Sequence, residues 1–199
     1  MTRQNEAVMQ RLRGALDSPP AVRKLLVTMR AQSVTRMDLA VAKILISERK
    51  ERGIYVTIDR PDKHVLTILS RHNVAGPGEA STEMEPAGKR LFIAKGIFSP
   101  AVFIGELLNR IRDPRSGPPL DAELRAMRFL LVDNLSSLAA YNGPKGIDAC
   151  FGHVAMMLMQ YPSMRFIALA GRDSLPALGP GATAFFNLGV EIPDEWLMD

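Results

Sequence analysis

The sequence predicts an α/β fold: a doubly wound, three-layer αβα sandwich around a mainly parallel sheet. Short apolar stretches rich in β-branched residues alternate about five times with longer stretches of helical periodicity, which is the order expected of such a fold. One stretch, FLLV at 129–132, is uninterrupted, as is typical of a strand buried on both faces. The 199 residues are 47% apolar and 23% charged, so the chain fits one globular domain with its own core.

The first part of the chain has the pattern of a helix, a strand and a second helix. Residues 3–16 space their apolar side chains as a helix does, and the sequence DSPP stops this helix. An apolar strand, LLV, follows at 25–27, and a broad apolar face predicts a helix over 38–51. We therefore divide the chain into an N-terminal helix and linker, residues 1–20, and a single α/β domain, residues 21–199.

The middle of the chain repeats this order. GIYVTID predicts a strand at 53–59, and a proline then opens a helix over 62–73. The segment AGPGEASTEMEPAGK at 75–89 is rich in Gly, Pro and Glu, which predicts a mobile loop. LFIAKGI predicts a strand at 91–97, and a helix with a Ser-Pro start follows over 98–112.

The next part holds the most apolar strand and the longest apolar stretch. DPRSGPPL predicts a loop at 113–120, and a short helix, DAELRAM at 121–127, leads into the strand that ends at Asp133. NLSSLAAYNGPKG at 134–146 contains Asn, Gly and Pro and predicts a loop. IDACFGHVAMMLMQY at 147–161 predicts a helix.

The C-terminal elements complete the sheet and suggest where a ligand would bind. RFIALA predicts a strand at 165–170, and the tail holds a loop and one last short strand near 184–192. Ligands of such sheets bind at the carboxyl ends of the strands. Three of these ends carry polar residues: the segment RAQSVTRM at 30–37, Asp59, and Asp133.

Charge and cysteine content limit the class of protein. A net charge of +4 is mildly basic, and the arginines around 113–120 have no interleaved aromatics, so nucleic acid is not favoured but stays open. Cys150 is the single cysteine, which rules out an intrachain disulfide and favours a cytoplasmic setting. The N-terminus mixes charges throughout, unlike a signal peptide, and the apolar stretch at 149–161 is shorter than the roughly 20 residues a bilayer needs, so no membrane association is expected.

The three junctions, in this order, resemble the RecA/KaiC-like branch of the P-loop ATPases. RGIYVTIDRPDKHVLTIL is similar to the second strand and following helix of that family, and RFLLVDNLSSLAAY to its Walker B strand and serine-rich turn. FIALAGRDSL and AFFNLGVEI resemble its later strands, so the resemblance covers about residues 24–199. It implies a RecA-like sheet, hydrolysis of ATP with Mg²⁺, Asp59 in place of the glutamate that activates water, and Asp133 as the Walker B aspartate.

The loop that defines the chemistry departs from the family. A working Walker A loop reads G-x-x-x-x-G-K-[ST]. When this motif is aligned with RAQSVTRM, its two glycines correspond to Arg30 and Thr35. Its lysine corresponds to Arg36 and its hydroxyl residue to Met37. Met37 offers no oxygen to Mg²⁺, and Thr35 is β-branched where backbone freedom is needed. Arg36 carries a broad planar guanidinium where the motif has the compact ammonium group of lysine. The Walker A loop is therefore degenerate.

A capping box is the structural alternative for this segment. Thr35 would accept from the N–H of Asp38, and Asp38 would reach back to Thr35. The helix N-terminus would then already hold a carboxylate, and a phosphate would have to compete with it. We therefore expect no ordinary MgATP site.

The candidate site residues each have a structural alternative. Asp59 and Asp133 are the catalytic candidates, and Asp133 is also the candidate metal ligand. Asp133 could instead accept hydrogen bonds from loop N–H groups, and Asp59 could form an Asx turn before Pro61, which we favour. The candidate nucleotide-binding residues are Arg30, Ser33, Thr35 and Arg36.

Three hypotheses follow. The first is a non-catalytic RecA/KaiC-like domain, a regulatory or protein-interaction module that binds a protein partner or forms a homo-oligomer and needs no cofactor. The second is a divergent nucleotide-binding ATPase that uses ATP and Mg²⁺ with Arg36, Asp59 and Asp133. The third is an unrelated doubly wound domain that binds a small ligand at the same strand ends. An open cleft among Arg36, Asp59 and Asp133 would favour the second hypothesis over the first.

Overall fold

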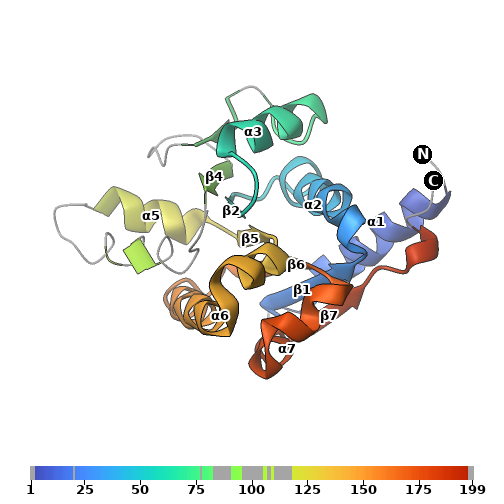
Figure 1. Ribbon diagram of the computed structural model, residues 1–199. Helices are drawn as coiled ribbons and strands as arrows, with labels where there is room; N and C mark the ends of the chain where they lie inside the picture. Colours follow the sequence, from blue (N-terminus) through green and yellow to red (C-terminus); the bar gives the residue numbers. More distant parts are fainter. Residues whose placement is uncertain are drawn as a thin grey trace.

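The chain folds as helices packed on both faces of one parallel sheet (Figure 1). This arrangement confirms the predicted three-layer α/β class. The computed structural model describes residues 3–19, 21–76, 78–82, 91–95, 105–106, 109 and 118–196.

The sheet has seven strands in the order β3-β4-β2-β5-β6-β1-β7, and every neighbouring pair is parallel. The strand order differs from the chain order because β5 and β6 lie between β1 and β2. In chain order the strands are β1 (Lys24–Met29), β2 (Gly53–Thr57), β3 (Ala80–Ser81), β4 (Leu91–Lys95), β5 (Phe129–Asp133), β6 (Arg165–Gly171) and β7 (Leu188–Glu191).

Two sets of helices cover the two faces of the sheet. α1 (Arg3–Leu16), α2 (Val34–Ala42) and α3 (Asp62–Arg71) pack on one face, and α6 (Leu135–Gln160) and α7 (Pro180–Phe185) pack on the other, together with the end of α5 (Pro118–Ala126) (Figure 1). Three short 3₁₀ segments, η1 (Ala31–Ser33), η3 (Arg172–Leu178) and η4 (Asp194–Trp196), lie outside these helices, and η2 (Lys43–Glu48) is a π-helical stretch that directly continues α2.

Successive side chains of the buried strands point to opposite faces of the sheet. In β5, Phe129 and Leu131 face α1 to α3, while Leu130 and Val132 face α6. All four side chains are fully buried, as the uninterrupted apolar sequence predicted. The N-terminal helix belongs to the same core, because Leu12 and its apolar neighbours on α1 pack in the buried cluster that contains β1.

The prediction of a loop over 134–146 is wrong. α6 begins at Leu135 and continues to Gln160, with a kink where Gly143 has φ 63° and Pro144 follows. The Asn134 side chain caps the helix by accepting from the N–H of Ser137. Gly143 and Pro144 therefore mark a kink between two helical segments of α6 and not the start of the helix.

Several element boundaries also differ from the predictions. α2 begins at Val34, four residues before the predicted start. β3 lies inside the predicted loop at 75–89, whose residues 77 and 83–89 lie outside the described part of the chain. The predicted helix at 98–112 also lies outside it, apart from residues 105, 106 and 109. α5 begins at Pro118, inside the predicted loop at 113–120.

Candidate functional site

The strand order brings two of the three polar strand ends together. β2 and β5 are neighbours, with Thr57 opposite Asp133. Asp133 therefore lies beside the turn that follows β2, where Asp59 and Arg60 are found. The end of β1 lies further along the same edge, with β6 between β1 and β5.

A buried network of four side chains occupies the space between these strand ends and α2. Arg60 donates from Nη2 to Oδ2 of Asp133 and, over 2.8 Å, to Oδ2 of Asp38. The Tyr55 hydroxyl donates to Asp38 and lies 3.0 Å from Oδ2 of Asp133. Asp38 is 1% exposed, Asp133 3%, and Tyr55 is fully buried. Two carboxylates therefore share one guanidinium and one phenol.

The charges in this network do not balance when both carboxyl groups are ionised. Burial raises the pKa of Asp38 to about 6, although the charge of Arg60 and the hydrogen bond from Tyr55 both lower it. Burial also raises the pKa of Tyr55, and the nearby Asp38 charge adds to this effect. The other carboxylate oxygens, Oδ1 of Asp38 and Oδ1 of Asp133, are buried without a hydrogen-bond partner in the described part of the chain. The network is therefore deficient in positive charge or protons.

Asp59 lies outside this network and is exposed. Its Oδ2 accepts from Ser137 Oγ and from Asn134 Nδ2 at 3.3 Å, so it joins the turn after β2 to the start of α6. The predicted Asx turn at Asp59 is wrong. Pro61 has no N–H to donate to it, and the N–H of Arg60 bonds to Thr57 Oγ1 instead, at 3.2 Å.

The segment 30–37 does not form an open phosphate loop. It makes one tight turn, η1, in which the N–H of Ser33 bonds to Arg30 O and the N–H of Val34 bonds to Ala31 O. These two donors are already used inside the turn and cannot point at a phosphate. At the end of β6, a Cβ added to Gly171 would lie 3.3 Å from the Ala31 side chain, so η1 packs closely against this strand end.

The predicted capping box is also wrong. Ser33 stands at the N-cap of α2 without a side-chain cap bond, and Thr35 is exposed within the first turn. Asp38 lies one turn further in, on the same buried face as Met37 and Val41. Because the helix begins four residues early, Asp38 points towards the sheet and meets Arg60 instead of reaching back to Thr35.

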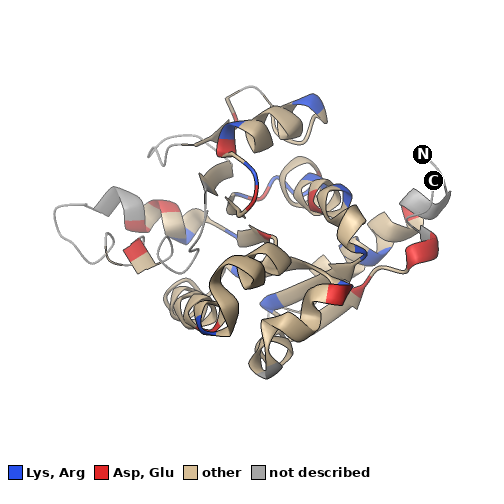
Figure 2. Ribbon diagram, in the orientation of Figure 1, with Lys and Arg blue, Asp and Glu red and all other residues tan. Residues whose placement is uncertain are grey.

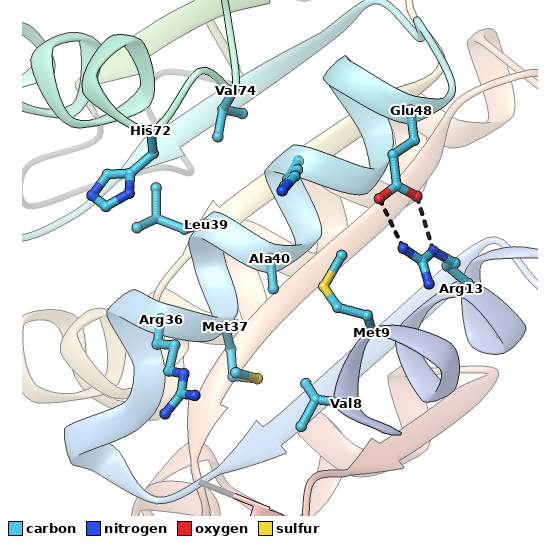
Figure 3. A pocket seen from close by; sticks show the side chains of 11 residues that line it. Val8, Met9, Arg13, Arg36, Met37, Leu39, Ala40, Glu48, His72 and Val74 are labelled. Carbon is cyan, nitrogen blue, oxygen red and sulfur yellow. Dashed lines mark hydrogen bonds and ion pairs between the residues drawn. The ribbon is translucent and has the colours of Figure 1, made fainter. Parts of the chain in front are cut away.

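The two arginine candidates point away from the strand ends that carry Asp59 and Asp133. Arg30 forms an ion pair with Asp194 of η4, at 2.9 Å. Arg36 lines a pocket between α1 and α2, together with Ala40 and Lys43, which are spaced to lie on one side of the helix (Figure 3). The lining of that pocket includes neither Asp59 nor Asp133. The pocket at Arg36 is therefore not a cleft shared with Asp59 and Asp133, as the ATPase hypothesis would require.

Sequence reasoning missed Tyr55 and Arg60 as members of the site. One signal was available for each. A tyrosine in the middle of a fully buried strand needs a partner for its hydroxyl, and an arginine that follows a strand end needs a carboxylate if it is buried. Neither signal says which carboxylate is the partner.

The described part of the chain contains no cluster of three or more His, Cys, Asp or Glu side chains that could hold a metal ion. None of its helices is both long and apolar enough to cross a bilayer. Comparison with protein-family models and with curated proteins finds no match for this chain.

Proposed function

We propose that this chain is a non-catalytic RecA/KaiC-like domain that acts as a regulatory or protein-interaction module and has lost ordinary MgATP binding. The observation that carries the proposal is the position of Arg60. Its guanidinium binds Asp133, the residue that matches the Walker B aspartate, and also Asp38. A tethered cation thus already bonds Oδ2 of Asp133 and lies where a metal or its waters would approach that oxygen. A Mg²⁺ ion that bound Oδ2 would have to displace Arg60 and leave a half-buried guanidinium without its carboxylate.

Two further observations support the loss of nucleotide binding. The N–H groups of Ser33 and Val34 are bonded inside η1. Met37 is buried and stands where Mg²⁺ would need a hydroxyl oxygen. The segment therefore cannot offer these two N–H groups to a phosphate, and it has no hydroxyl oxygen at position 37 for Mg²⁺.

The interaction half of the proposal rests on α6. The exposed large hydrophobic residues within the described part of the chain are Tyr141, Met156 and Met159, and all three belong to this helix. Met159 is 81% exposed. From Ala149 to Gln160 the helix has no charged residue, and it is almost entirely uncharged in Figure 2. Exposed methionines on an uncharged helix face suit a contact with another protein.

Calorimetric titration tests the nucleotide half. MgATP and MgADP should give no binding heat at millimolar concentration with the wild-type protein. Binding tighter than about 100 μM would contradict the proposal, because that affinity exceeds stray anion contacts. Arg60→Met serves as the informative comparison: nucleotide binding gained only in this variant would show that Arg60 itself blocks the site.

Sedimentation velocity tests the interaction half. We expect association of the wild-type chain that depends on concentration and is lost in Met159→Lys. Ser70→Lys, which adds the same charge to an exposed position of α3, is the matched control and should associate as the wild type does. A wild-type chain that stays monomeric at every concentration would reject self-association through α6.

A further inference from the structure

A small pocket lies at the edge of the sheet where the strands begin, opposite the edge that carries Asp59 and Asp133. It has a volume of about 230 Å³ and is lined by residues from the linker after α1, from the starts of neighbouring strands and from the turn after α6. This volume is below the roughly 300–1,000 Å³ of pockets that enclose drug-sized ligands, so it suits a small ion or one charged group of a larger molecule.

Three arginines line this pocket because three neighbouring strands begin there. Arg23 directly precedes β1, Arg128 directly precedes β5, and Arg165 is the first residue of β6. β6 lies between β5 and β1 in the sheet. The N–H of Arg165 bonds to Arg128 O at 2.9 Å, and the N–H of Phe166 bonds to Arg23 O at 2.7 Å. Because parallel strands start at the same edge, the three guanidinium groups reach one pocket.

One of these arginines is compensated by a carboxylate. Arg165 Nη2 donates to both carboxylate oxygens of Glu51, at 2.6 and 2.7 Å. Among the described residues that line the pocket, Glu51 is the single acidic one. Arg49 Nη1 lies 3.7 Å from its Oε1 as well. Glu51 is therefore already paired with cations and does not offset the charge of the other two arginines.

Arg23 and Arg128 have no carboxylate partner in the described part of the chain. Arg23 is partly buried and donates from Nη1 to two uncharged carbonyls at the end of α6, Leu158 O at 2.7 Å and Pro162 O at 3.2 Å. The Arg128 side chain is exposed and makes no hydrogen bond or ion pair there. The described lining thus carries three guanidinium groups against one carboxylate, an excess of two positive charges.

The excess charge and the small volume together favour one class of ligand. Two guanidinium groups without a carboxylate match a dianion, and the fork of N–H donors on each fits phosphate oxygens. A phosphate monoester carries about −1.5 to −2 charges at pH 7, whereas a single carboxylate would compensate only one arginine. Ser18 and Ser163 also line the pocket, and their hydroxyl groups can donate to an anion.

We propose that this pocket binds a phosphate dianion at Arg23 and Arg128, either as inorganic phosphate or as the phosphate group of a small ester. The site lies at the opposite edge of the sheet from Asp133, so it does not depend on the proposed loss of MgATP binding. In MgATP the metal ion already occupies phosphate oxygens, which removes much of the charge that these arginines recognise. A phosphate without bound metal is therefore the ligand.

Inorganic phosphate, glycerol 3-phosphate and glycerol are the probes, titrated by calorimetry at about pH 7.5, where the ester is a dianion. We expect both phosphates to bind with a dissociation constant of about 1 mM or below and glycerol not to bind. Tighter binding of glycerol 3-phosphate would identify an ester as the ligand, and equal or weaker binding of the ester would identify inorganic phosphate. Absence of binding by both phosphates at about 10 mM would overturn the proposal.

Two variants locate the site. Arg128→Met removes an exposed side chain that has no bonded partner in the described part of the chain, so it should fold normally and weaken phosphate binding at least about fivefold. Arg71→Met, which removes an exposed arginine of α3 outside the described lining, is its control and should bind as the wild type does. Ser163→Asp places a carboxylate in the lining and should abolish binding, whereas Ser70→Asp, the same change at an exposed position of α3, should not. Undiminished binding in both pocket variants would place the phosphate elsewhere and refute the assignment.

Discussion

Replacing Arg60 by methionine should destabilise the protein in a way that depends on pH. Methionine keeps much of the aliphatic bulk and removes the guanidinium that bonds both Asp38 and Asp133. Both carboxyl groups are almost completely buried, so neither can recover its lost partner from water. The variant therefore isolates the cost of burying two carboxyl groups without a counter-charge.

The size of the effect follows from burial. Breaking a buried ion pair costs about 3–5 kcal/mol, and the Arg60 side chain is 18% exposed, which favours the lower value of about 3 kcal/mol near neutral pH. A domain of this kind has a free energy of unfolding of roughly 5–15 kcal/mol, so the loss is easily measured.

The pH dependence follows from Asp38. Its folded-state pKa of about 6 lies above the ordinary value of 3.8, so folding favours the protonated form. This contribution to stability is fully present below pH 3.8 and is lost as the pH rises through about 6. Removing Arg60 removes a charge that lowers this pKa, so the pKa rises further in the variant. The destabilisation should therefore be largest near neutral pH and shrink by about 1 kcal/mol or more on acidification to about pH 5.

Urea denaturation followed by circular dichroism at about pH 5, 6 and 7.5 measures this dependence. Arg125→Met, which removes an exposed guanidinium paired with Asp121, is the control and should leave the midpoint unchanged. Adding Asp38→Asn to Arg60→Met should restore part of the stability near neutral pH, because one unpaired charge is gone. A loss below about 1 kcal/mol, or one that does not change with pH, would refute the reasoning.

Three further predictions concern α6 and its core. Asn134→Ala should cost about 1 kcal/mol of unfolding free energy, measured in urea, because the N–H of Ser137 loses its cap; an unchanged midpoint would contradict the cap. Phe151→Ala should cost roughly 3–5 kcal/mol, since Phe151 stacks on Phe185 at 4.3 Å; thermal melting checks this, and a loss under about 1 kcal/mol would disprove the packing. The Cys150 thiol is buried and its pKa is raised to about 12, so a thiol reagent should label it only in the unfolded protein, and rapid labelling of the native protein would show otherwise.

Local patterns in the sequence were sufficient for the class of fold. The alternation of apolar strands and amphipathic helices depends on residues close together in the chain, and the strand at 129–132 and the last strand near 184–192 were predicted from such patterns. The prediction of a loop over 134–146 failed because its Asn, Gly and Pro residues are also used within helices. In α6, Asn134 is the cap, and Gly143 and Pro144 form the kink.

The candidate site depended on relations that no local pattern contains. Asp133 and Asp59 were predicted at strand ends, yet their neighbours follow from the strand order, which places β5 beside β2. The start of α2 at Val34 turns Asp38 inward and Arg36 outward, so one boundary decides which of them belongs to the buried network.

By itself, the sequence determined the parallel α/β architecture and the absence of a G-x-x-x-x-G-K-[ST] motif, because both depend on residue types within short stretches of the chain. Only the tertiary structure decided that Arg60 fills the space beside Asp133 and that Arg36 faces a separate pocket. The physical reason is that helix phase and strand order bring together side chains from distant segments, and the energy of a buried charge depends on those neighbours.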